Sequence, residues 1–279
     1  MSETKTFSAI PMRTWRWLGV NEGLMPENIT DTIKKKQILV EAGQQDQVIL
    51  TNRESAQYEV QVHIADGGEL HLVNVQLVSA AEPCTGRVKV YLGKGAKFSY
   101  TAVEAGASHV AAELTVDMAG DDSVSDIWAL YFGDGSRKVD MNYVIRQGGK
   151  RTDANMQVRG ALLGSSEKIF RGTLDFLEGT KGSVGRENEE VVLLSPAVRN
   201  RSVPIMLSHE DDVDGHHAVS VGKMDEEKLF YLMSRGLSED GARAMLVRGF
   251  VEPVSKALPL EYAVEMNNLI NLELKGSLK

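Results

Sequence analysis

The sequence has little of what most redox, secreted and membrane proteins require. Cys84 is the only cysteine among 279 residues. The chain alone can therefore form neither an internal disulfide, nor a CxxC redox pair, nor a four-cysteine cluster site. No apolar run approaches the roughly 20 residues that cross a bilayer, and residues 1–19 contain no apolar stretch followed by a small-residue cleavage site. We therefore expect a cytoplasmic protein without a membrane span.

Positive charge and catalytic motifs are also scarce. The chain has 31 basic against 39 acidic residues and a net charge of -8, which disfavours attraction to nucleic acid phosphates or anionic membranes. Neither a phosphate-binding GxxxxGK[ST] loop, nor an HExxH zinc helix, nor a GxSxG nucleophile elbow occurs. We expect protein partners, with no nucleic acid or membrane among them.

The stretch between residues 34 and 206 alternates apolar and polar residues in short runs. Examples are "YEVQVHI", "RVKVYL" and "KVDMNYVIR", separated by polar turns such as "ADGGEL", "GKGAKF" and "RQGGKR". Alternation of this kind predicts β-strands. The turns recur at irregular intervals of roughly 15 to 30 residues, which favours a solenoid of stacked coils, although a β-sandwich would show the same alternation.

The period changes after Gly222, where three helices are expected. The first, "DEEKLFYLMSRG", has Asp225 as its N-cap and Gly236 after its end. The second, "SEDGARAMLVRGF", begins at Ser238 and should end before Pro253. Pro259 opens the third, "LPLEYAVEMNNLINLEL". The chain thus divides into an N-terminal arm (1–33), a β core (34–222) and a helical domain (223–279).

The arm contains two tryptophans, Trp15 and Trp17, in "TWRWLGVNE". Aromatic side chains contribute strongly to packing wherever they are buried. We therefore predict that they anchor the arm on the β core, although docking to a partner would use the same pattern.

The segment "HEDDVDGHHAVSVGK", residues 209–223, gathers histidines and acids that are good donors for zinc or iron. His216 and His217 are adjacent, so on a strand their rings would point to opposite faces. One hypothesis is a metal-dependent β-helix enzyme that uses His209, Asp212 and His217. Cys84, which follows a proline in a turn-like stretch, is interpreted as an incidental small apolar residue.

The segment "DDVDGHHAVSVGKMDEEKLFYLMSRGLSEDGARAMLVRGFVEPV", followed by "LPLEYAVEMNNLI", resembles the C-terminal region of the SufB/SufD family of iron-sulfur cluster assembly proteins. The stretch "LLSPAVRNRSVPIMLSHEDDV" is similar to the family's last β-coils. The resemblance implies a right-handed parallel β-helix followed by a small α-helical domain. It also implies a scaffold subunit that catalyses no turnover itself.

The resemblance further implies protein partners. Members form dimers and carry a SufC-like ABC ATPase on their C-terminal helices, and the cysteine desulfurase system acts with them indirectly. Whether this chain forms a homodimer or a heterodimer with a SufB-like chain stays open. The anchors expected for the ATPase are Leu229, Tyr231, Met245 and Phe250.

His217 matches the family's histidine near the dimer interface, so the resemblance makes it the candidate ligand for a transient iron-sulfur cluster. Which of His216 and His217 faces that interface stays open. The stretch "GRENEEVVLL" lacks the SufB-type cysteine, and Gly215 stands where SufD-type members have one. The chain is therefore interpreted as SufD-like or as a divergent short paralogue whose cluster is shared with a cysteine-bearing partner. A third hypothesis is a purely structural dimerisation module.

Overall fold

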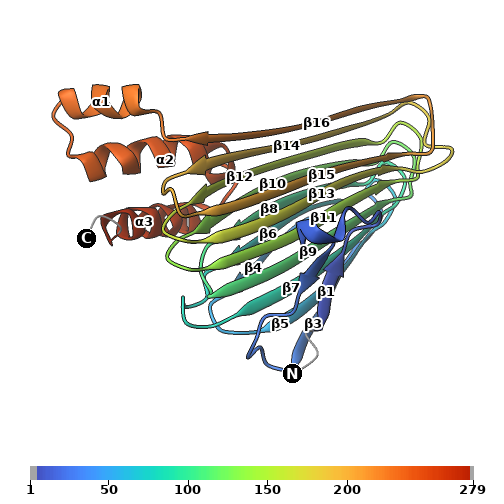
Figure 1. The fold of residues 1–279 in the computed structure, drawn as a ribbon. Helices are drawn as coiled ribbons and strands as arrows, with labels where there is room; N and C mark the ends of the chain where they lie inside the picture. The colour runs from blue at the N-terminus through green and yellow to red at the C-terminus, as the bar shows by residue number, and fades with distance from the viewer. Residues whose placement is uncertain (1–4, 277–279) are drawn as a thin grey trace.

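The computed structural model describes residues 5–276 and shows two parallel sheets, each of seven strands, wound into one β-helix (Figure 1). The odd-numbered strands from β3 onward form one sheet, here called the odd sheet: β3 (Ile33–Val40), β5 (Gln57–Ile64), β7 (Cys84–Leu92), β9 (His109–Met118), β11 (Lys138–Gln147), β13 (Glu167–Phe176) and β15 (Arg199–Ser208). The even sheet contains β4 (Gln45–Asn52), β6 (Glu69–Gln76), β8 (Lys97–Glu104), β10 (Val124–Gly133), β12 (Asp153–Leu162), β14 (Ser183–Leu193) and β16 (Val213–Lys223). The predicted parallel β-helix is confirmed.

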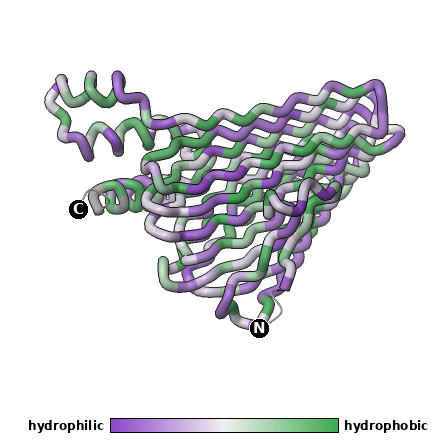
Figure 2. The backbone as a smooth tube through the Cα atoms, viewed as in Figure 1, coloured by the Kyte–Doolittle hydropathy of each residue, from purple (hydrophilic) through white to green (hydrophobic). Residues whose placement is uncertain are grey.

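Each coil adds one strand to either sheet, and the coils lengthen along the chain. Gln45 pairs with Glu69, 24 residues later, whereas Arg159 pairs with Glu190, 31 residues later. Alternate residues of the strands point inward and form one continuous core, to which the end strands β4, β15 and β16 add half-buried residues such as Val48, Met206 and Val213. Figure 2 shows this alternation of hydrophilic and hydrophobic residues along the strands.

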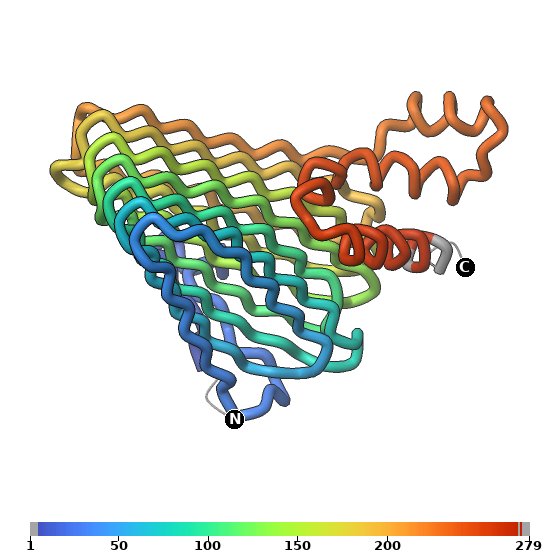
Figure 3. The backbone as a smooth tube through the Cα atoms, turned by 180° about the vertical axis from the view of Figure 1, so that it is seen from behind, coloured from blue at the N-terminus to red at the C-terminus, as the bar shows by residue number. Residues whose placement is uncertain are grey.

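The C-terminal part of the chain folds into three helices along the side of the β-helix where the even strands end: α1 (Glu226–Ser234), α2 (Glu239–Ser255) and α3 (Leu260–Gly276) (Figure 3). The expected N-caps are confirmed, since Asp225 accepts from the Lys228 amide at 3.0 Å and Ser238 accepts from the Gly241 amide at 3.2 Å. Among the described residues, no helix is long and apolar enough to span a membrane.

The second helix does not end before Pro253, as the sequence predicted, but continues to Ser255. Val251 and Val254 are buried in a second core, where α2 and α3 cover the outer side of the even sheet at residues such as Val103 and Phe132. Burial of these side chains compensates for the hydrogen bond that a proline cannot donate.

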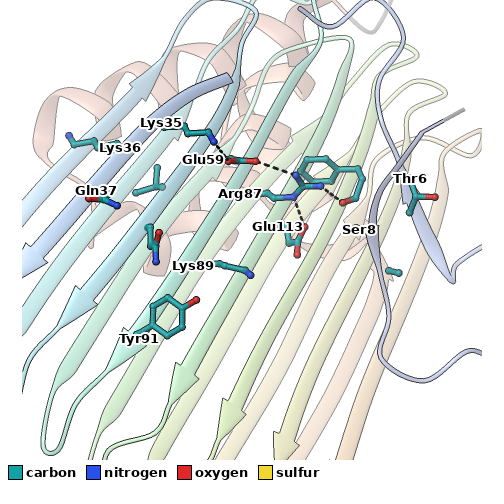
Figure 4. Close-up of a pocket in the computed structure, with 14 residues that line it drawn as sticks. Thr6, Ser8, Lys35, Lys36, Gln37, Glu59, Arg87, Lys89, Tyr91 and Glu113 are labelled. Carbon is teal, nitrogen blue, oxygen red and sulfur yellow. Dashed lines mark hydrogen bonds and ion pairs between the residues drawn. The ribbon is translucent and has the colours of Figure 1, made fainter. Parts of the chain in front are cut away.

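The N-terminal arm lies on the outer face of the odd sheet. Its strands β1 (Thr6–Ala9) and β2 (Glu22–Leu24) pair antiparallel around the 3-10 helix η1 (Arg16–Leu18). Side chains of the sheet donate to the arm's carbonyl groups: Arg87 to Phe7, Asn142 to Ala9, and Arg171 to Val20 and Glu22. The Arg87 contacts are visible in Figure 4.

The tryptophans do not anchor the arm. Trp15 is 73% exposed and Trp17 is 79% exposed, because the arm is held through its main chain and through Phe7, whose ring lies 4.4 Å from the Arg87 guanidinium carbon. The prediction that Trp15 and Trp17 are buried was therefore wrong.

Candidate functional site

The last strand, β16, places the two adjacent histidines on opposite faces of its sheet. His216 is in register with Arg186 and His217 with Glu187, and the Glu187 side chain is buried inside the β-helix. Side chains at paired positions of parallel strands lie on the same face. His217 therefore belongs to the inner face of β16, whereas the outer-face His216 places its Nε2 2.8 Å from an Asp214 oxygen.

Gly215, two residues before His217, also belongs to the inner face. A Cβ at this position would lie 2.7 Å from the Met206 sulfur and 3.2 Å from the Phe176 ring. The absence of a side chain thus lets the ends of β15 and β16 approach each other. A larger residue here would require Met206 to move.

One coil below His217, a lysine and two glutamates are buried in the interior. Lys168 makes an ion pair with Glu189 and donates to the Ser202 hydroxyl at 3.0 Å, while the Tyr131 hydroxyl donates to Glu189 at 3.0 Å. Burial lowers the pKa of Lys168. The side chains of this ion pair are completely shielded from solvent.

Glu187 lies in the same interior but has no hydrogen-bond partner among the described residues for either carboxylate oxygen. Burial first, and then the neighbouring Glu189, raises the pKa of Glu187 to about 8, against the opposing effect of Lys168. Gly172 leaves room for this carboxyl group, since a Cβ there would lie 2.1 Å from Glu187 Oε1. A buried, protonated acid thus lies directly beneath the exposed His217.

The other donors considered from the sequence are not brought together here. His209 follows β15 beside Asp175, Asp212 lies in the turn before β16, and His217 is on the inner face of that strand. Within residues 5–276, no group of three or more His, Cys, Asp or Glu residues is arranged to hold a metal ion.

The only thiol is also remote from the last coil. Cys84 is buried on β7, four strands from β15 in the odd sheet, or about 20 Å at roughly 4.8 Å per strand. Burial first, then Glu104, raises the pKa of Cys84 to about 12, so it is a poor nucleophile and ligand at neutral pH. This agrees with its interpretation as an apolar core residue.

Helix α1 exposes several large apolar side chains. None of its residues is buried, and Phe230, Tyr231 and Met233 are 73%, 55% and 40% exposed. Figure 1 shows α1 held away from the β-helix, beyond α2. Exposed apolar clusters of this kind are typical of protein-binding surfaces.

The four residues expected to anchor a partner differ in exposure. Tyr231 and the α2 residue Met245 are exposed, at 55% and 49%. Leu229 is half-buried, and Phe250 is half-buried against the even sheet with its ring 5.4 Å from the Arg159 guanidinium carbon. Phe230 was not predicted as an anchor, because apolar residues occur on all sides of α1 and their pattern does not reveal which side faces α2.

Fold and site together define a parallel β-helix protein that places a histidine of its last strand over buried acids of the coil below and carries an exposed helix directly after that strand. The family model described as SUF system FeS cluster assembly, SufBD core domain, matches residues 27–250. The chain therefore belongs to the SufBD family.

Curated relatives support this assignment. The iron-sulfur cluster assembly SufBD family protein of Mycobacterium bovis is 35% identical over 160 residues, which cover 57% of this chain and 19% of the relative. The corresponding protein of Mycobacterium leprae is 35% identical over 160 residues, covering 57% and 18%. That of Staphylococcus haemolyticus is 42% identical over 110 residues, covering 39% and 24%. The matched segments thus span less than a quarter of the length of these relatives, whose names link the family to iron-sulfur cluster assembly.

Proposed function

We propose that this chain is a scaffold subunit of a SUF-type iron-sulfur cluster assembly complex. The observation that carries the proposal is the position of His217, which is exposed on the inner face of the last strand, in a chain of the SufBD family. Imidazole nitrogen is a known substitute for thiolate in some iron-sulfur sites. His217 would provide one ligand to the nascent cluster, which is cargo of the complex.

The remaining ligands would come from a second chain. The sheets end at β15 and β16, whose outer edges pair with no strand in residues 5–276. Unpaired strand edges are ready sites for association with another chain, and joining two such ends would bring His217 to the junction. Because the only thiol is buried far below, sulfur and cysteine ligands would be supplied by a cysteine-bearing, SufB-like chain and, indirectly, by a cysteine desulfurase system.

A SufC-like ABC ATPase would bind helices α1 and α2, which follow the last strand, β16. Phe230, Tyr231 and Met233 of α1 and Met245 of α2 are large apolar side chains that residues 5–276 leave exposed. Aromatic side chains and methionine are enriched at protein interfaces. ATP-driven movement of the partner would then act on the strand that directly precedes α1 and carries His217.

Cluster maturation in cells tests the role of His217. We expect His217→Ala to abolish maturation of iron-sulfur enzymes in a strain that depends on this chain. His216→Ala is the matched control, since it removes an imidazole of the outer face and should leave maturation near the wild-type level. Normal maturation with His217→Ala would instead support a purely structural dimerisation module.

A further inference from the structure

The inward positions of the β-helix change in character on its last coil. Residues in register on successive strands of one sheet form a column, since paired positions of parallel strands lie on the same face. The inward column that ends at Met206 of β15 otherwise consists of branched aliphatic residues: Ile38, Val62, Val90, Val116, Ile145 and Leu174. A sulfur-bearing side chain thus occurs in this column only on the last coil.

The even-sheet column that meets Met206 becomes narrower toward the same coil. From β6 to β16 this column contains Leu70, Phe98, Ser125, Ala154, Gly185 and Gly215. Glycine at its end leaves space that Met206 fills, since a Cβ on Gly215 would lie 2.7 Å from the Met206 sulfur and 3.0 Å from its methyl group. The sulfur atom therefore lies directly against the main chain of β16.

His217 lies two residues farther along β16, on the same inner face as Gly215. Successive inward positions of a strand are about 7 Å apart. Methionine is unbranched and rotates about three side-chain bonds, and the exposed His217 ring is free to turn, so both donor atoms can reach one metal ion. Met206 is half-buried and His217 is exposed, so both are accessible at the last coil.

Packing alone does not require a sulfur atom at this position. Leu174, one coil below, fills the same column with an aliphatic side chain of similar size. Thioether sulfur is a soft donor that favours Cu(I) and iron-sulfur clusters, and imidazole binds copper and iron. A thioether carries no proton, so unlike a thiol it is available as a ligand without deprotonation. Met206 is also the only sulfur-bearing residue of β15 and β16.

We propose that Met206 and His217 together form a soft-metal site on the last coil. The inference rests on the proposed function, in which His217 is a ligand of the nascent cluster, and it adds a sulfur donor from this chain itself. The pair would hold one iron of that cluster through an imidazole and a thioether, while the partner chain supplies thiolate ligands and sulfide. The same pair would bind Cu(I), which accepts low coordination numbers and therefore serves as a probe of the chain alone.

Anaerobic titration of the purified chain with Cu(I), in competition with the chromogenic chelator bicinchoninate, tests the inference. Met206→Leu should weaken Cu(I) binding at least about tenfold, since even the loss of an outer-shell partner of a metal ligand typically costs that much. This substitution conserves volume and should leave the fold intact. His217→Ala should weaken binding similarly, and the double variant should be no weaker, because both residues bind the same ion. Copper X-ray absorption should show a sulfur ligand in the wild type that Met206→Leu lacks.

The matched controls remove the same chemical groups elsewhere. Met245→Leu removes a thioether of α2 that is 49% exposed, and His216→Ala removes the imidazole on the outer face of β16. Both variants should bind Cu(I) as the wild type does. A Met206→Leu variant with wild-type Cu(I) affinity overturns the inference and leaves the role of His217 in maturation standing. Normal maturation with His217→Ala overturns the proposed function instead, so the two failures are distinguishable.

Discussion

Buried acids are the most unusual individual residues of this β-helix. Glu104 and Glu187 are each at least 98% buried, and neither has a hydrogen-bond partner for its carboxylate oxygens among the described residues. Burial raises the pKa of Glu104 to about 8, as it does for Glu187. At neutral pH both residues are therefore predominantly protonated, because their ionised forms would be buried without compensation.

Glu104 predicts a specific dependence of stability on pH. The folded state retains a proton that the unfolded chain releases near pH 4.5, so the free energy of unfolding should fall as pH rises from about 4.5 to about 8. The Glu104→Gln side chain cannot ionise, so this variant should not show that fall in the free energy of unfolding. Its stability relative to the wild type should rise by as much as about 4 kcal/mol between pH 5 and pH 8.5, measured by urea denaturation.

The control for this experiment is Glu41→Gln, a substitution at an exposed turn position. Its pH profile should run parallel to that of the wild type. Parallel profiles for Glu104→Gln as well would show that the buried carboxyl does not hold the proton assigned to it.

The two adjacent histidines show what the alternation pattern of a strand predicts and what it leaves open. Alternation predicted that His216 and His217 face opposite sides of a strand, and the structure confirms this. Which one faces inward depends on the register between β14 and β16, which pairs His217 with the buried Glu187. Register is a property of the stacked coils, so no single strand sequence reveals it.

Features of the helices and strands that depend only on neighbouring residues were predicted correctly from the sequence. Asp225 and Ser238 cap their helices as predicted, because N-capping depends on a side chain and amides within the same turn. In β10, "VSDIWALYFG", strict alternation is lost, because Leu130 and Phe132 on its outer side are covered by α2 and α3. The exposed tryptophans were mispredicted because the arm's anchoring lies in its carbonyl groups.

Arg171 should be the principal anchor of the arm. Its side chain is fully buried, pairs with Asp140 and donates to two arm carbonyls. Arg171→Met would leave Asp140 buried without its cation, at a cost of about 3 to 5 kcal/mol. We expect faster trypsin cleavage after Arg13 and Arg16, measured by limited proteolysis and mass spectrometry.

Arg186→Met provides the comparison for the arm experiment. Arg186 pairs with Asp153 at 2.8 Å on the surface, with both side chains about half exposed, and such pairs contribute less than about 1 kcal/mol. Cleavage of the arm should be unchanged in this variant. Equal cleavage rates in both variants would contradict the anchoring role of Arg171.

At the scale of the whole molecule, the β-helix places two distinct surfaces around one coil. The unpaired edges of β15 and β16 lie at the last coil, and the exposed helix α1 begins directly after β16. A chain joined to a copy or paralogue at one surface and to an ATPase at the other would transmit movement through β16. This arrangement is the physical basis of the proposed scaffold role.

The central claim is tested most directly by the solution mass of the purified chain, alone and mixed with the SufC-like ATPase of the same cell. Light scattering on a sizing column should show a complex of one dimer with two ATPase subunits. Phe230→Ala combined with Tyr231→Ala should weaken ATPase binding at least tenfold without changing the dimer, because both side chains are exposed on α1. A wild-type chain and an ATPase that elute separately at micromolar concentration would contradict the account.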